Sequence, residues 1–106
     1  MITVTVTKKN NFYTEFTSRG HAGYAEEGQD IICAAVSVLV INTVNSLETL
    51  THDRISVEEN DGYVSFSFIE PVTEGGTLLM DSLVLGLTEI ENSYSKKYLK
   101  VKVREV

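Results

Sequence analysis

A cysteine and a histidine in one short stretch predict nucleophilic chemistry. Residues 20–37 read GHAGYAEEGQDIICAAVS, and they contain Cys33, the only cysteine, together with His21, one of two histidines. Asp30 is a favourable N-cap, because its carboxylate can accept hydrogen bonds from the amides of a first helical turn. Cys33 then lies at the positive end of a helix, which favours the thiolate. A cysteine beside a base is the minimal arrangement for covalent catalysis.

Several roles near Cys33 stay open at this point. Asp30 either caps the helix or orients His21, and a charged Asp30 near the sulfur opposes thiolate formation. The amide of Cys33 is a candidate donor to the oxyanion of a tetrahedral intermediate, provided that Asp30 does not occupy it. Ser37, one turn later, contacts the substrate or the sulfur, or bonds back to the helix backbone. Cys33 itself also suits a core position, since free cysteine is often buried.

The same run resembles the signature of the ribosomal-processing cysteine protease family Prp. That family shows Gly-His-Ala, a short glycine-containing loop and Gly-x-Asp-Ile-Val-Cys-Ala-Ala-Val-Ser. Residues 20–22 and 28–37 correspond to it here, with Ile32 in place of the valine. The resemblance implies a cysteine endopeptidase whose catalytic pair is His21 and Cys33. It also implies a homodimer, and a substrate that is the precursor of large-subunit ribosomal protein twenty-seven, from which an N-terminal extension is removed.

The residues around this pair are expected to support catalysis or to bind substrate. They are Gly20, Gly23, Tyr24, Gly28, Asp30 and Ser37. The loop of residues 22–29 either closes over the substrate or is a plain connection. Grooves near the helix start, lined by Tyr13, Phe16 and Tyr24, are expected to select apolar substrate residues.

Two competing interpretations come from other functional classes. One is a non-enzymatic ribosome-associated binding module, with Cys33 in the core and basic C-terminal residues facing RNA. The other is a metal site formed by His21, Asp30, Cys33 and His52, but zinc ligands normally occur in closer pairs. We therefore expect neither a metal nor a cofactor, and we interpret His52 as an exposed residue at a helix end.

Composition is that of an ordinary globular protein, with 106 residues, 42% hydrophobic residues and 23% charged residues. This length predicts one domain, residues 1–106. The net charge of −6 disfavours general nucleic-acid binding by a basic face. No apolar run is expected to reach the roughly 20 residues of a membrane span. A secretion signal is not expected either, and one cysteine cannot form an internal disulfide, so the chain is expected in the cytoplasm.

Hydrophobic periodicity predicts the order ββαββαβ. Two hairpins are expected, with strands at about 2–7 and 12–19 and at 55–60 and 63–69, the second closed by Asp61-Gly62. Simple alternation places Phe12 and Phe16 on one face of their strand and Tyr13 on the other. Helices are expected at about 31–50 and 74–94, and a last strand at 98–103. The economical arrangement is an α+β two-layer domain, with two helices on one face of a mostly antiparallel sheet.

Overall fold

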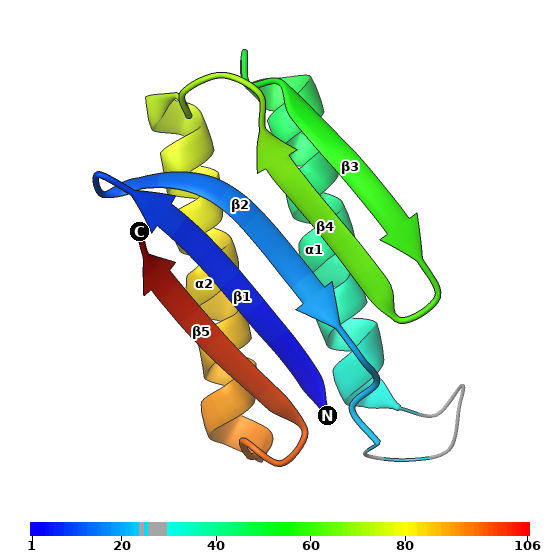
Figure 1. Cartoon of the computed structure of the whole chain (residues 1–106). Helices are drawn as coiled ribbons and strands as arrows, with labels where there is room; N and C mark the ends of the chain where they lie inside the picture. Colours follow the sequence, from blue (N-terminus) through cyan, green and yellow to red (C-terminus); the bar gives the residue numbers. More distant parts are fainter. Residues whose placement is uncertain (24, 26–29) are drawn as a thin grey trace.

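The chain folds into five strands and two helices in the predicted order. The structure is a computed structural model that describes residues 1–23, 25 and 30–106. Its elements are β1 (Ile2–Lys9), β2 (Phe12–Arg19), α1 (Ile31–Leu50), β3 (Ile55–Asn60), β4 (Tyr63–Phe68), α2 (Glu74–Tyr94) and β5 (Leu99–Glu105) (Figure 1). The predicted bounds of both helices agree with those found.

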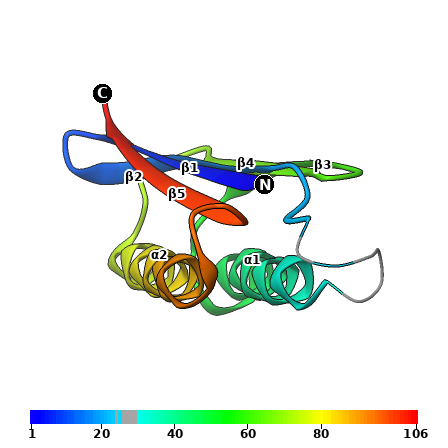
Figure 2. The ribbon, with the colours of Figure 1, turned by 90° about the horizontal axis from the view of Figure 1, so that it is seen from below.

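The sheet has the strand order β3-β4-β2-β1-β5. All neighbours are antiparallel except β1 and β5, which are parallel, with Val4 opposite Val101. Both helices cover the same face of the sheet (Figure 2). The two-layer α+β arrangement is therefore confirmed. The strands β3 and β5 form the two edges, and β3 lies on the side of α1 (Figure 1).

The first hairpin departs from simple alternation because it contains a β-bulge. The β1–β2 register shifts after Thr7, so that Thr14 has no partner across the ladder, and its hydroxyl donates to the carbonyl of Thr7 at 3.1 Å. A bulge inserts one extra residue and reverses the face of those beyond it. Tyr13 and Phe16 are consequently both buried, whereas Phe12 is 59% exposed. The expected separation of Tyr13 from Phe16 was wrong.

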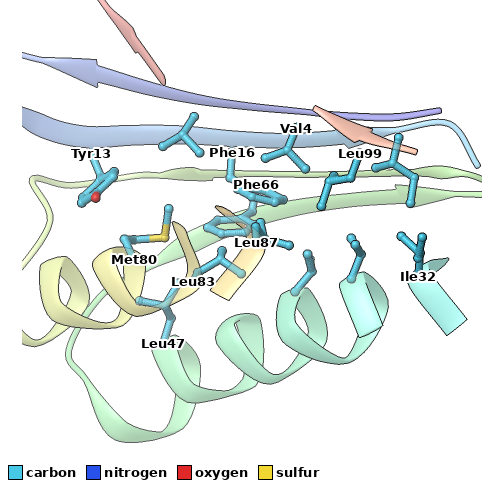
Figure 3. Packing of buried hydrophobic residues seen from close by; sticks show 14 of the residues in the cluster. Val4, Tyr13, Phe16, Ile32, Leu47, Phe66, Met80, Leu83, Leu87 and Leu99 are labelled. Atoms are coloured by element: carbon cyan, nitrogen blue, oxygen red, sulfur yellow. The ribbon is translucent and has the colours of Figure 1, made fainter. Parts of the chain in front are cut away.

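The core fills the space between the sheet and the two helices (Figure 3). At its centre the rings of Phe16 and Phe66 stack with 5.1 Å between centroids. The helices contribute one buried stripe each, namely Ile32, Val36, Val40, Thr43 and Leu47 from α1 and Gly76, Met80, Leu83, Leu87 and Glu91 from α2. These stripes fix which side of α1 faces the sheet and which side stays open.

Helix α1 corrects one expectation about apolar runs. Its 20 residues have a mean hydropathy of 1.7, so by length and composition alone it is apolar enough to cross a membrane. A core helix of a globular protein passes the same test, and one face of α1 packs on the sheet. Several apolar side chains on its other sides are nevertheless exposed, among them Ile31, Val38 and Ile41.

A buried carboxylate joins the end of α1 to the start of α2. Asp53 accepts hydrogen bonds from the amide of Thr73 at 2.8 Å and from its hydroxyl at 2.6 Å. Burial alone raises the pKa of Asp53, but the hydrogen bonds from Thr73 outweigh it, and the net pKa lies below its ordinary value. The Thr73 hydroxyl in turn accepts from Gly76, which caps α2.

Candidate active site

Asp30 caps α1 as its residue type predicts. One carboxylate oxygen accepts hydrogen bonds from the amides of Ile32 and Cys33, each at 3.0 Å. These are two of the donors that the first turn leaves without a helical partner. The Cys33 amide is therefore occupied, and the condition for its use as an oxyanion donor is not met in this structure.

The sulfur of Cys33 receives a hydrogen bond that sequence reasoning missed. The amide of Ala22 donates to Sγ at 3.2 Å, and Ala22 is buried beside the half-buried cysteine. The contact joins the end of the β2 segment to the first turn of α1. Ala22 is part of the Gly-His-Ala signature, but only the fold shows that its amide contacts the sulfur of Cys33.

The thiol pKa lies above its ordinary value in this structure. Burial is the largest cause; the Ala22 amide acts in the opposite direction, and hydrogen bonding with Asp30 and its negative charge add to the increase. The position at a helix N-terminus favours the thiolate, but these surroundings favour the thiol. Cys33 therefore requires a base to become a nucleophile.

His21 lies at the start of the loop that leads to α1, and its side chain is exposed. Its imidazole lies against the turn between β3 and β4, where a Cβ added to Gly62 would be 2.8 Å from Nε2. The Gly20 amide donates to the Gly62 carbonyl at 2.7 Å, which ties the two segments together. The sequence identified Asp61-Gly62 only as a hairpin turn, and nothing local shows that this turn borders the histidine.

His21 and Cys33 line one groove between α1 and the β3–β4 hairpin. Its volume is about 830 Å³. Its other lining residues are Ile2, Ser18, Gly20, Val36, Ser37, Val40, Ile41, Val44, Asn45, Val57, Glu59, Asn60, Asp61, Gly62, Tyr63 and Val64. Among residues 1–23, 25 and 30–106, no hydrogen bond joins the imidazole to the sulfur. The two groups share a wall of the groove and are accessible to the same bound molecule.

Of the other predicted supporting residues, some line the groove and others do not. Gly20 and Ser37 line the groove, and the Ser37 hydroxyl makes no hydrogen bond to any described residue. Gly20 has a φ of 101°, and an added Cβ would collide with the carbonyl oxygen of Met1. Gly23 has a φ of 71° with open space around it. Tyr24 and Gly28 lie outside the described residues.

Tyr13 and Phe16 do not line the groove, contrary to expectation. The bulge at Thr14 places Tyr13 on the same face as Phe16, and both rings are buried in the core. The groove is lined mainly by α1 and the β3–β4 hairpin instead. The valines and isoleucine of these elements that line the groove were not among the residues selected from the sequence. Their signal was the unusually apolar surface of the first half of α1.

The alternative metal set is not brought together by the fold. Cys33 is in the first turn of α1, whereas His52 follows its C-cap, Thr51. A rise of about 1.5 Å per residue separates the two by roughly 27 Å. Within the described part of the chain, no group of three His, Cys, Asp or Glu side chains is placed to hold a metal ion.

The chain is similar to proteins that are named as cysteine proteases. The family model "Cysteine protease Prp" matches residues 1–100. The ribosomal processing cysteine protease Prp of Bacillus subtilis is 33% identical over 85 residues, which are 74% of this chain and 76% of that protein. Its Staphylococcus aureus counterpart is 29% identical over 91% of this chain and 93% of that protein.

A solved structure agrees over nearly the whole fold. The S. aureus protease Prp in complex with a covalently linked product peptide superposes with a TM-score of 0.93, at 26% identity, covering 98% of this chain and all of that one. The match to the family model spans both His21 and Cys33. On the family match and the agreement of fold, this chain belongs to the family of the cysteine protease Prp.

Proposed function

We propose that this chain is a cysteine endopeptidase in which Cys33 is the nucleophile and His21 is the general base and acid. Its proposed substrate is the precursor of large-subunit ribosomal protein twenty-seven, from which it removes the N-terminal extension. The observation that carries the proposal is the single groove that exposes both the sulfur and the imidazole. Relatives named as ribosomal processing proteases support the substrate, and a ribosomal substrate supports a cytoplasmic location.

The chemistry starts from the Cys33 thiol, whose pKa lies above its ordinary value. His21 takes the proton of the Cys33 thiol, and the thiolate attacks the carbonyl carbon of the scissile peptide bond. His21 then returns the proton to the leaving amine as the C–N bond breaks, which leaves a thioester on Cys33. A water molecule, deprotonated by His21, hydrolyses the thioester and regenerates the thiol. The Ala22 amide favours the thiolate at the first step.

The competing binding-module interpretation requires a buried and unreactive Cys33. The half-exposed sulfur in a groove shared with His21 favours the enzyme instead. The basic residues of β5 point away from the groove: Lys100, Lys102 and Arg104 pair with the threonines of β1 and are exposed.

We also propose that the enzyme is a homodimer. The outer face of the helical layer exposes four large apolar side chains, Ile31, Val38, Leu78 and Leu85. Several large apolar side chains exposed on one face are typical of protein interaction sites. A second copy of this chain offers the same apolar face, as a two-fold interface requires.

The test is cleavage of the purified ribosomal precursor, followed by mass spectrometry. Cys33→Ala is expected to abolish cleavage and leave the thermal unfolding curve unchanged. His21→Ala is expected to lower kcat by about 10²–10⁴-fold, the usual contribution of general base catalysis. His52→Ala is the matched control, because this histidine is exposed at the far end of α1. Normal processing by Cys33→Ala, or equal losses in the two histidine variants, would refute the assignment.

A further inference from the structure

The groove continues well beyond the catalytic residues. From Cys33 it follows one side of α1 for three turns to Asn45, with β3 as the facing wall. Val57 of β3 is opposite Phe66, which is buried in the core, so both side chains point toward the helical layer. Yet Val57 is 42% exposed. The chain's own side chains do not fill the space between the layers at this edge.

The apolar part of the groove lies away from the catalytic end. Its lining there is aliphatic, with Val40, Ile41 and Val44 from α1 and Val57 from β3. Contact between these aliphatic side chains and apolar groups of a bound molecule is favourable, because it removes apolar surface from water. This part of the groove adjoins Cys33 without interruption, so a peptide whose carbonyl is at the sulfur has a path into it.

The catalytic end of the same groove is acidic. The β3–β4 turn lies beside His21, and Glu59 and Asp61 of this hairpin line the groove close to that turn. Glu59 is opposite Val64 and two residues from Val57, so it shares the face of Val57. Its neighbour Glu58 points to the other face of the sheet. An inward-pointing charge also protects an edge strand from pairing with another chain, but that role does not require a place in the groove.

We infer that Val57 and Glu59 are specificity-determining residues, and this inference rests on the proposed protease function. The occupant is an extended substrate segment. Its apolar side chains occupy the space between Val44 and Val57, and a basic side chain near the scissile bond is held by Glu59. The enzyme thus reads an apolar segment next to a basic one, with each half of the groove selecting one half of the pattern.

Each variant has a matched control elsewhere on the sheet, either on the opposite edge strand or on the opposite face. Val57→Ser removes apolar surface from the groove, and its control is Val103→Ser, a half-exposed valine on the opposite edge strand that also faces the helices and does not line the groove. Glu59→Gln removes the charge, and its control is Glu58→Gln. All four side chains are exposed enough that thermal unfolding should change little.

The probe is a synthetic peptide that spans the N-terminal extension of the ribosomal precursor and the residues after it. Val57→Ser is expected to lower kcat/KM by about tenfold, the effect of one small apolar group in a binding pocket. It should also reduce the wild-type preference for the parent over a peptide whose large apolar residues are alanine. Glu59→Gln is expected to remove the preference for a lysine-containing over a glutamine-containing peptide at low salt, where charge pairing is least screened.

The outcomes separate this inference from the proposed function. Cleavage by the wild type but not by Cys33→Ala, with both groove variants equal to their controls, would overturn the inference alone. Absence of cleavage by the wild type, or full activity of Cys33→Ala, would overturn the proposed function and this inference with it. Loss of selectivity in the groove variants but not in the controls would support both.

Discussion

Replacing Gly62 by alanine tests whether the β3–β4 turn positions His21. Gly62 has a φ of 66°, and its hypothetical Cβ would lie 2.8 Å from Nε2. The left-handed conformation costs about 1–2 kcal/mol for a residue with a Cβ. The steric conflict adds little to this, because the imidazole is the free end of a side chain and can move. The structure therefore predicts a modest loss of stability and a displaced base.

Activity should fall much more than stability. A general base contributes about 10²–10⁴-fold, and a displaced imidazole loses a large part of that. The control is Asn11→Ala in the β1–β2 turn, where Asn11 has a φ of 67° and is remote from the groove. The measurements are urea unfolding and the pH dependence of kcat/KM for peptide cleavage. If both variants lose similar stability and both keep their activity and pH profile, Gly62 does not position His21.

Three further predictions concern charge and assembly. Asp30→Asn keeps an N-cap side chain but removes the negative charge near Cys33, so the thiol pKa should fall and the midpoint of iodoacetamide alkylation should move to lower pH; an unchanged midpoint contradicts the role given to Asp30. Asp53 has a lowered folded-state pKa, so its contribution to stability is present above the unfolded pKa and is lost as pH falls through the folded one. Asp53→Asn should therefore be less stable than wild type near neutral pH, and urea titrations should show a smaller difference below about pH 4; a constant difference would refute this linkage. Val38→Glu combined with Leu85→Glu should give a monomer in sedimentation analysis without loss of fold, and a dimer of unchanged stability would show that the outer helical face is not the interface.

Local patterns predicted much of the fold and the chemical part of the site. Asp30, with Cys33 three residues later, identified a capped helix and its first-turn cysteine, because capping depends on residues close in sequence. The bulge at Thr14 was not predictable in this way, since it depends on how β2 pairs with β1. That single residue reversed the orientation of Tyr13, which lies with Phe16 in the core, and neither ring lines the groove.

Strand order also depends on contacts between residues distant in sequence. The sequence indicates that the Asp61-Gly62 turn closes a hairpin, but not that the hairpin joins β2 and places Gly62 against His21. The groove lies between α1 and the β3–β4 hairpin at one edge of the sheet, so its position depends on this strand order. No local signal in either segment marks its position.

The contact between Met1 and Gly20 has a practical consequence for how this enzyme is prepared. Met1 lies against Gly20, and Ile2 lines the groove, so residues added before Met1 emerge next to His21. An affinity tag there is an extended peptide tethered at the mouth of the proposed substrate groove, and its local concentration is about millimolar. Such a tag is expected to compete with added substrate and to raise the apparent KM. The C-terminus is at the other end of the sheet (Figure 1), so a tag placed after Val106 leaves the kinetics undisturbed.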